Sequence, residues 1–380
     1  MRILFITRGF PSESNPMDGN YEAVQAKAIA AKGHQVSVIA IKWKSFSHFF
    51  CDQSVRHRRV DGIDVYECIK TYPFNPLITM PKIELRWRQR LFRKVFRQYL
   101  CEQGMPDIVH AHIINIAAPA IILKNDYHLP FVITEHWTKM NVNAFSQRLQ
   151  ALTFVYHHAD RVICVSQALA ESLHRNFQVE SVVINNMVSN LFFQDKKICR
   201  NDDLFHFIAV GALRKNKGFD ILIEAFSKAH FPQNVRLDII GGGEEYEHLK
   251  VMVTNYGLTE QVQLLGVLTP EEVSKRLCLS DCFVLSSRLE TFAIVVIEAM
   301  AKGLPVIATA CGGPETFVRP SEGMLISKEN VTELSMAMQK MLTCYKDYDS
   351  ERIRQYCYEH FSQDVIADQI IDIYKQILNK

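Results

Sequence analysis

The feature that most restricts the fold of this chain is a regular alternation of short apolar runs and helical patterns in its second half. Apolar runs at residues 207–210, 235–240 and 262–265 each end in glycine, and a helical pattern follows each of them. Such runs are typical of strands buried on both faces of a parallel sheet, because a crossover helix joins each strand to the next. The alternation continues through 282–285 and 306–308. We therefore expect a parallel α/β domain in the second half.

The first half shows the same alternation, starting with a buried strand at residues 2–7 and a helix at 21–32. A polar, non-periodic stretch at 185–203 separates the halves and is expected to contain the linker. A chain of 380 residues is too long for one ordinary core, so two domains are expected. Further strands of the first half are predicted at 35–41, 107–112, 131–134, 161–165 and 181–184, with a hairpin within 42–70.

Composition excludes several classes of protein. A net charge of +2 argues against a nucleic-acid binder. The ten cysteines include no C-x-x-C pair, so free thiols in a reducing compartment are expected and a zinc site is not. No apolar stretch approaches about 20 residues, so no membrane span is predicted. We expect a cytoplasmic protein, with any membrane contact peripheral.

A predicted helix at 81–104 has an unusual charge pattern. Between residues 82 and 97 it carries seven basic residues and one acid, Glu84. Its apolar stripe, from Trp87 to Leu100, has helical spacing and fits packing on the core. The basic face fits either a solvated surface or contact with anionic lipid or a phosphorylated acceptor.

Two glutamates of the second half are candidate site residues. Glu290 follows the strand at 282–285, and Glu298 lies in a helix predicted at 292–302. A carboxylate among apolar neighbours is costly without a partner or ligand, and two adjacent ribose hydroxyls would suit Glu298. An ion pair with a nearby Lys or Arg explains it equally well. The new helix N-terminus beside Glu290 favours a bound phosphate.

The loop at 211–218 has the chemistry of a diphosphate site. Arg214 can grip two phosphate oxygens, Lys217 adds a compact charge, and Gly218 lets the chain turn into the next helix. The loop is not a P-loop, because GxxxxGK[ST] is absent from the chain. The first half also lacks GxGxxG, which disfavours a dehydrogenase; Gly19 instead permits close backbone approach, or is a plain turn glycine.

Histidines stand at the ends of two first-half strands, where ligands of parallel sheets collect. His136 is the best candidate among them. His110 and His112 are two apart on one strand with no third ligand nearby, so they are not expected to bind metal.

Taken together, these residues resemble the retaining glycosyltransferases of family 4. The resemblance is carried by Glu290-x7-Glu298, the loop 211–218, the turn 241–243, Gly266-Val267 and residues 299–306. It implies the GT-B fold, an α/β architecture of two Rossmann-like, doubly wound parallel-sheet domains that face an inter-domain cleft. It places an acceptor-side domain at 1–190 and a nucleotide-sugar donor domain at 191–361, with a helix at 362–378 packing back on the first domain.

The resemblance also implies roles for the site residues. Glu298 would hold the ribose, while Arg214 and Lys217 would neutralise the leaving diphosphate. Glu290 would bind hydroxyls of the donor sugar. The remaining implied positions are the amides of Phe292 and Ala293 at the donor sugar, Gly211 in the phosphate loop, Gly19 against the diphosphate or acceptor, His136 near the donor sugar, and Val267 and Leu268 by the base.

The implied activity is a retaining, hexosyltransferase-type transfer without metal or cofactor. A UDP- or GDP-linked sugar would pass to a hydroxyl of a saccharide or lipid-linked saccharide, in cell-surface polysaccharide or glycolipid synthesis. The setting would be cytoplasmic, with possible contact of residues 82–97 with the inner face of the membrane and no nucleic-acid partner.

Three positions depart from the family pattern. Ala293 stands where glycine is common, the first loop has only Asp18-Gly19, and residues 186–189 replace Asn-Gly-Val-Asp. Two alternatives remain open at this point. One is a non-hydrolysing nucleotide-sugar epimerase on the same fold, and the other is a non-catalytic sugar-binding subunit.

Overall fold

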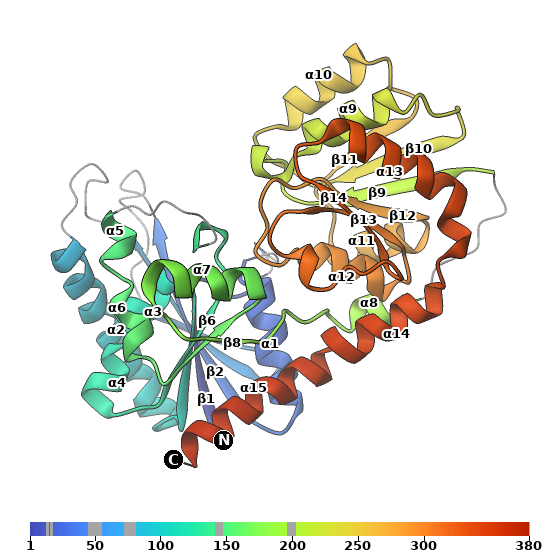
Figure 1. Ribbon diagram of the computed structural model, residues 1–380. Coiled ribbons are helices and arrows are strands. Elements are labelled where there is room, and N and C mark those ends of the chain that lie inside the picture. The colour runs from blue at the N-terminus through green and yellow to red at the C-terminus, as the bar shows by residue number, and fades with distance from the viewer. Residues whose placement is uncertain are drawn as a thin grey trace. The chain divides into compact units, whose positions relative to one another are not determined.

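The computed structural model describes residues 1–12, 15, 18–44, 55–71, 81–140, 147–195 and 203–379. They form two compact units (Figure 1). Unit 1 comprises Met1–Asn185 and Gln363–Lys380, and unit 2 comprises Asn186–Ser362. Each unit is a largely parallel sheet with helices on both faces, so the predicted doubly wound α/β architecture is confirmed.

The sheet of unit 2 has six parallel strands in the order β11-β10-β9-β12-β13-β14. The winding reverses between β9 and β12, which lie side by side although two strands separate them in sequence. Five of these strands coincide with the predicted apolar runs, and β14 was not predicted. The bounds are β9 Phe205–Val210, β10 Val235–Ile240, β11 Val262–Gly266, β12 Cys282–Leu285, β13 Val306–Ala310 and β14 Gly323–Ser327.

Helices cover both faces of this sheet. One group packs α9 (Phe219–Lys228) against α10 (Tyr246–Asn255) and α13 (Val331–Cys344). The other group packs α12 (Ile294–Ala301) against α14 (Ser350–Phe361) and the short α8 (Leu191–Gln194), with α11 (Pro270–Cys278) also touching α8. These helices cover the two faces of the sheet, whereas loops alone cover the ends of its strands.

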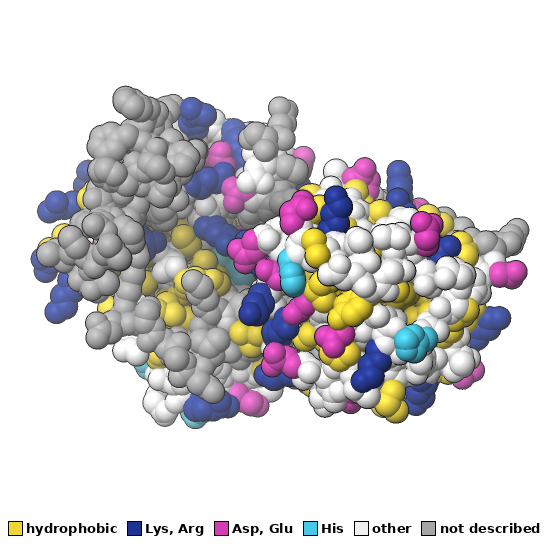
Figure 2. Space-filling view, turned by 90° about the horizontal axis from the view of Figure 1, so that it is seen from above, with side chains coloured by type: hydrophobic (Ala, Val, Ile, Leu, Met, Phe, Trp, Pro, Cys, Tyr) yellow, Lys and Arg dark blue, Asp and Glu magenta, His cyan; other side chains and the backbone are white. Residues whose placement is uncertain are grey.

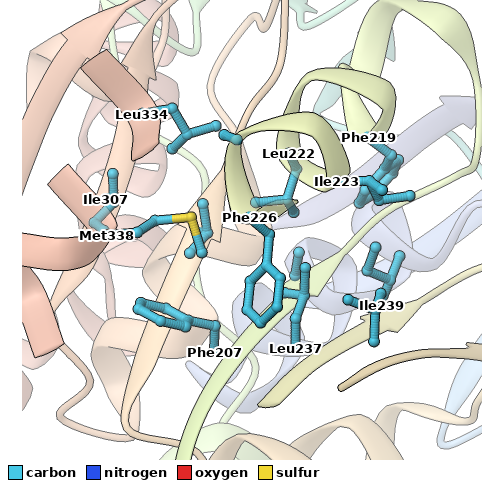
Figure 3. Packing of buried hydrophobic residues seen from close by; sticks show 14 of the residues in the cluster. Phe207, Phe219, Leu222, Ile223, Phe226, Leu237, Ile239, Ile307, Leu334 and Met338 are labelled. Carbon is cyan, nitrogen blue, oxygen red and sulfur yellow. The ribbon is translucent and has the colours of Figure 1, made fainter. Parts of the chain in front are cut away.

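The core beneath α9 fixes the first strand–helix unit (Figure 3). Phe226 and Leu222 of α9 point onto the sheet, where they meet Phe207 of β9 and Leu237 of β10. All four side chains are buried, and a fully buried side chain of this kind contributes roughly 1.5–3 kcal/mol. This packing holds β9 and α9 in place, and with them the loop that joins the two elements.

The sheet of unit 1 has eight strands in the order β3-β4-β2-β1-β5-β6-β7-β8, and only β3 is antiparallel to its neighbour. The predicted hairpin is β3–β4, whose turn residues Asp61 and Gly62 both have positive φ, as a type I′ turn requires. The winding reverses between β1 and β5. The bounds are β1 Arg2–Thr7, β2 Gln35–Lys44, β3 Val55–Val60, β4 Ile63–Thr71, β5 Ile108–His112, β6 Phe131–Glu135, β7 Arg161–Cys164 and β8 Val182–Val183.

Helices α1 and α15 pack on each other, and α3 packs with α2 and α6 (Figure 1). Ser166 caps α7 by accepting a hydrogen bond from the Leu169 N–H, as expected of an N-cap serine. All cysteines in the described ranges are free; Cys51 and Cys199 lie outside them. The bounds are α1 Asn20–Ala31, α2 Pro81–Gln103, α3 Ile114–Ala120, α4 Ile122–Tyr127, α5 Gln147–Gln150, α6 Phe154–His158, α7 Gln167–Phe177 and α15 Gln363–Leu378.

The basic helix α2 differs from the sequence-based expectation in one respect. Four residues of its apolar stripe are buried as predicted, Phe92, Val95, Phe96 and Tyr99, and the others are partly buried. Two of its seven cations do not belong to a free basic face. Arg88 is buried, lies 3.7 Å from Glu84 and donates to the carbonyl of Asn115. Arg93 forms an ion pair with Asp126 at 2.7 Å. Five exposed cations remain, Lys82, Arg86, Arg90, Lys94 and Arg97.

The C-terminal helix α15 is fastened to the sheet of unit 1 by a buried hydrogen-bonded group. The Tyr374 hydroxyl lies 2.5 Å from Nδ1 of His110, whose Nε2 lies 2.7 Å from the Thr134 hydroxyl. All three side chains are buried. Burial lowers the pKa of His110 to about 3, so the imidazole is neutral and both of its nitrogens are satisfied.

Replacing Tyr374 with Phe removes one partner of this buried imidazole. We expect a loss of about 1–3 kcal/mol in the free energy of unfolding, because Nδ1 of His110 is left unpaired. Urea denaturation followed by circular dichroism measures this loss. Tyr256→Phe, at an exposed tyrosine, is the control and is expected to change little. Equal stability of the two variants would contradict the anchoring role of Tyr374.

Candidate functional site

Most of the predicted site residues lie on two loops of unit 2. One loop follows β9 and the other follows β12, so they leave neighbouring strands at the point where the winding reverses. In doubly wound sheets, ligands bind at the carboxyl ends of the strands beside this point. Sequence reasoning grouped these residues by chemistry, and the topology brings them together.

The two loops are joined by an ion pair between predicted site residues. Lys217 Nζ lies 2.6 Å from Glu290 Oε1, and the Ser287 hydroxyl donates to the same oxygen at 2.7 Å. Glu290 is only 5% exposed. The cation expected at the diphosphate and the carboxylate expected at the sugar are therefore bound to each other in the free protein.

A second link across the loops is made by Arg288, which sequence reasoning missed. Its guanidinium binds both carboxylate oxygens of Asp220, at 2.9 and 2.8 Å, and also donates to the Lys215 carbonyl. Its backbone N–H donates to the Asn216 carbonyl at 2.9 Å. Burial opposes ionisation of Asp220, but the bonds from Arg288 keep the pKa of that carboxyl below its ordinary value. The bidentate pair ties the loop after β12 to the start of α9, and the bonds to the Lys215 and Asn216 carbonyls tie it to the loop after β9.

Gly218 ends the phosphate loop, and the contact with the second loop explains why it is glycine. It caps α9 with φ 65° and ψ 26°, in the left-handed region. A Cβ at this position would lie 2.1 Å from the Ser286 carbonyl oxygen. Because backbone meets backbone here, a larger residue would push the two loops apart.

The N-terminus of α12 lies on the second loop and has no side-chain cap. Ala293, the N-cap residue, has φ 73°, a conformation that costs a non-glycine residue roughly 1–2 kcal/mol. This explains physically why glycine suits the position better. The Phe292 ring is buried against Phe317 and Phe361, so only its backbone remains for a ligand.

Glu298 has none of the partners that an ordinary helix glutamate would have. It is partly buried in α12, and no side chain in the described ranges forms an ion pair or hydrogen bond with it. Burial raises the pKa of its carboxyl to about 7. The ion-pair explanation therefore finds no support in the described part of the chain.

The remaining unit 2 candidates lie at the same ends of the strands. Arg214 is exposed, and its side chain has no ion pair within the described ranges. The Gly211 N–H donates to the Ile240 carbonyl at 2.9 Å, which extends the pairing of β9 with β10 to the start of the loop. The Val267 side chain is 74% exposed and lies next to Gly242 of the glycine turn. Leu268, the following residue, is partly exposed.

Gly19 and His136 are the two candidates that lie in unit 1. Gly19 caps α1 with φ 65°, and a Cβ there would lie 2.2 Å from the Gly9 carbonyl oxygen. Packing within the loop after β1 thus accounts for this glycine, and Gly9 is a partner that sequence reasoning missed. His136 follows β6, and its Nε2 lies 3.9 Å from Glu22 Oε1. Burial lowers the pKa of His136 to about 3.

Comparison with known proteins assigns both halves of the chain. Residues 22–189 match the model described as Glycosyltransferase Family 4, and residues 192–360 match Glycosyl transferases group 1. The chain belongs to glycosyltransferase family 4. The predicted family is confirmed, and the protein is a glycosyltransferase.

Relatives and solved structures agree with this assignment. The chain is 27% identical over 375 residues to the phosphatidylinositol N-acetylglucosaminyltransferase GPI3 subunit of Saccharomyces cerevisiae, covering 91% of this chain and 76% of the relative. It is 25% identical over 359 residues to the putative teichuronic acid biosynthesis glycosyltransferase TuaC of Bacillus subtilis, covering 89% and 88%.

Among solved structures, sucrose-phosphate synthase from Thermosynechococcus elongatus superposes with a TM-score of 0.79 at 22% identity, over 100% of this chain and 99% of that one. Anabaena HepE in complex with UDP gives 0.72 at 19% identity, over 99% and 100%. These similarities confirm the predicted GT-B fold.

The raised pKa of Glu298 predicts a pH-dependent stability. Between its ordinary value of 4.5 and about 7, the folded carboxyl binds a proton that the unfolded one has lost. Stability from this group is therefore lost as pH rises through that window. Glu298→Gln, which cannot ionise, is expected to be more stable than the wild type at pH 8 by up to roughly 3 kcal/mol. The gain should vanish near pH 4.5.

Urea unfolding at pH 4.5, 6 and 8 measures this difference. Glu224→Gln on α9, at an exposed glutamate, is the matched control and should show no such trend. A Glu298→Gln variant that is less stable than the wild type at pH 8 would show that the carboxylate has a stabilising partner.

Proposed function

We propose that this glycosyltransferase transfers a sugar from a UDP- or GDP-linked donor to a hydroxyl of a saccharide or lipid-linked saccharide, with retention of configuration. The observation that supports it most is the Lys217–Glu290 pair joining the loops after β9 and β12, beside a Glu298 with no ion pair among the described residues. A cation, a sugar-binding carboxylate and a ribose-binding carboxylate then lie on adjoining loops and on the helix that follows one of them.

The charges of this site suit a leaving diphosphate. Arg214 can grip phosphate oxygens, and the uncapped N-terminus of α12 adds backbone N–H groups and the positive end of its dipole. Positive groups fixed where negative charge develops lower the barrier of the chemical step. This set needs no metal ion to balance the diphosphate.

Donor binding would rearrange the Lys217–Glu290 pair. The diphosphate attracts Lys217, and as Lys217 turns toward it, Glu290 becomes available to accept hydrogen bonds from the sugar. Ser287 still donates to Glu290 and keeps its carboxylate in position. In the free protein each charge compensates the other, so neither is left buried without a partner.

The nucleoside would lie beside the C-terminal end of β11 and beside α12. Glu298 would accept from both ribose hydroxyls, and the exposed apolar surface of Val267, with Leu268, would contact the base. The HepE structure is described as a complex with UDP, which is consistent with a nucleotide at this kind of site. Ribose hydroxyls that donate hydrogen bonds to Glu298 would also favour its charged carboxylate over the protonated form.

Transfer with retention needs no covalent sugar–enzyme intermediate in this arrangement. The bond between the anomeric carbon and the phosphate oxygen breaks, and the acceptor oxygen bonds to the same face. The acceptor proton passes to the leaving phosphate oxygen. Glu290 would accept hydrogen bonds from the sugar hydroxyls and would not act as a nucleophile, while Ser287 donates to one of its oxygens. Neutral His136 would donate a hydrogen bond to the donor sugar.

The biological setting is proposed from the relatives. GPI3 is described as a phosphatidylinositol N-acetylglucosaminyltransferase subunit and TuaC as a putative teichuronic acid biosynthesis glycosyltransferase. From these descriptions we propose a cytoplasmic role in cell-surface polysaccharide or glycolipid assembly. Helices long and apolar enough to cross a membrane are absent from the described part of the chain.

Helix α2 is the surface we propose for membrane contact. Its five exposed cations fall within roughly a third of the helix circumference at 100° per residue. Figure 2 shows Lys and Arg side chains gathered along the side of unit 1 on which α2 lies. Ile83, 53% exposed, lies within the same arc. Each such cation contributes about 1 kcal/mol at an anionic leaflet.

Nucleotide binding tests the donor site. In thermal-shift titrations with UDP, GDP, ADP and NAD, we expect UDP or GDP to raise the melting temperature of the wild type. Glu298→Ala and Lys217→Ala should each lower the affinity at least tenfold, because each removes a charge-assisted contact. Glu224→Ala should bind as the wild type does. A response to NAD alone, or full binding by both site variants, would refute the assignment.

Vesicle sedimentation tests the proposed membrane surface. Vesicles of phosphatidylcholine with 30% phosphatidylglycerol (roughly the charge density of an anionic leaflet) should bind the protein, and added salt should weaken binding. Changing Lys82, Arg86 and Arg90 to Gln should abolish it. The control changes Lys250, Lys340 and Arg352 to Gln, which removes the same charge from exposed positions of unit 2. An equal loss of vesicle binding in both triple variants would show that α2 has no specific role in membrane contact.

A further inference from the structure

Arg288, in the loop after β12, is a cation beside the proposed diphosphate site, and the proposed function gives it no role. Its side chain is 22% exposed and contacts the loop after β9, residues 211–218, which we call the phosphate loop. A cation in this place could bind a phosphate of the donor directly. It could also hold the phosphate loop in position for other residues. The contacts of Arg288 distinguish these two roles.

The Arg288 guanidinium is already bound by other protein groups. Nη1 and Nη2 donate to the two carboxylate oxygens of Asp220 at 2.9 and 2.8 Å. Nη1 also donates to the Lys215 carbonyl at 2.5 Å, and Nε donates to Glu329 at 3.1 Å. Every nitrogen of the guanidinium therefore has a partner. A phosphate could bind Arg288 only by breaking its bidentate pair with Asp220, which is a strong interaction.

The loop after β12 binds three successive carbonyls of the phosphate loop. The Lys215 carbonyl accepts from the Arg288 side chain, and the Asn216 carbonyl accepts from the Arg288 N–H at 2.9 Å. The Lys217 carbonyl accepts from the Ser286 hydroxyl at 3.2 Å. Bonds to three carbonyls in a row fix the orientation of three planar peptide groups. Arg288 provides two of these bonds, and so it holds the backbone that leads into Lys217.

The order of groups in a nucleotide sugar places Lys217 at one of the two phosphates. After the base, the order is ribose, first phosphate, second phosphate and sugar. In the proposed function Glu298 holds the ribose and Glu290 holds the sugar, and Lys217 Nζ lies 2.6 Å from Glu290. Lys217 therefore lies at the sugar end of the diphosphate. This end is the second phosphate, which a nucleoside monophosphate lacks.

The Arg288–Asp220 pair contributes position and little charge. Its two charges cancel, so the pair adds only a weak field at the phosphate. A phosphate contact made by a lysine is weaker when the lysine must first be ordered, because ordering a long side chain and its loop costs entropy. Fixing the backbone of Lys217 before the donor arrives removes part of this cost.

We propose that Arg288 and Asp220 are positioning residues that make the donor site select nucleoside diphosphates over nucleoside monophosphates. This inference rests on the proposed function, because it needs the nucleotide to bind at these loops. Lys217 contacts the second phosphate, and Arg288 acts through the phosphate loop without touching the ligand.

Isothermal titration calorimetry of the full chain with UDP, UMP, GDP and GMP tests this selection. The wild type should bind one diphosphate more tightly than the monophosphate of the same base. Arg288→Lys keeps the charge but cannot form the bidentate pair. Asp220→Asn keeps the size of the side chain but removes its charge. Each variant should weaken diphosphate binding at least about fivefold and monophosphate binding less than about twofold.

The sign of the Asp220→Asn effect separates positioning from electrostatics. Removing a negative charge near the site would by itself strengthen the binding of an anion, and it would also release the guanidinium to bind the phosphate. Positioning predicts weaker binding. Tighter diphosphate binding by Asp220→Asn, or wild-type affinity in Arg288→Lys, would overturn the proposal. An equal loss for diphosphate and monophosphate would also overturn it, because general damage to the fold affects both ligands alike.

The matched control is Arg276→Lys on α11. Arg276 lies 3.6 Å from Asp238, outside both loops, so this variant should bind every nucleotide as the wild type does. The double variant Arg288→Lys with Asp220→Asn should bind the diphosphate within about twofold of the weaker single variant, because both changes break one link. Losses that multiply in the double variant would contradict a shared role.

The titration of the wild type separates this inference from the proposed function. Equal affinity for a diphosphate and its monophosphate would refute the selection alone and leave the nucleotide site standing. Absence of binding by all four nucleotides would refute the proposed function, and this inference with it.

Discussion

The donor site proposed in unit 2 depends on two links between the loop after β9 and the loop after β12. Lys217 is joined to Glu290, and Arg288 is joined to Asp220 and to the backbone of the phosphate loop. Without these links, two loops leaving adjacent strands toward opposite faces of the sheet would be free to separate. Charges of both signs hold the two loops together, so the backbone of the proposed donor site is already in place before a charged donor arrives.

The two units use the same backbone device for different chemistry. Gly19 and Gly218 have nearly identical conformations, each caps the helix after the first strand of its sheet, and each lies against a backbone carbonyl. Beyond this shared turn, unit 2 gathers Arg214, Lys217 and a helix N-terminus, which suit phosphates. Unit 1 gathers neutral imidazoles and the Glu22 carboxylate at the corresponding end of its sheet.

The sequence predicted the architecture better than the contacts within the sites. Apolar runs located the strands at 2–7, 235–240 and 282–285 because buried parallel strands need no alternation. Residue chemistry grouped Lys217 with Glu290 in one candidate site, and the structure joins these two side chains by an ion pair. It did not predict that Lys217 binds Glu290, because partners 73 positions apart are set by strand order.

Other contacts were equally hidden from sequence reasoning. In the sequence, Arg88 looks like one more exposed cation of α2. It is buried because α2 packs against α3, which the sequence does not predict. Glu22 and His136 are brought together by the pairing of β1, β5 and β6, which no local pattern encodes. At Ala293 the sequence did point to a local feature. It has alanine where the family often has glycine, and in the structure this residue has a positive φ.

The central claim is that Glu298 keeps a partly buried, unpaired carboxylate in place for the ribose of a nucleotide. Carbon-13 NMR of the side-chain carboxyl, assigned by its loss in Glu298→Gln, reports its pKa directly. We predict a pKa of about 7 in the free protein and a fall of at least about one unit with saturating UDP or GDP, because hydrogen bonds from the ribose favour the charged form. An ordinary pKa in the free protein, or a raised one that no nucleotide changes, would contradict the account.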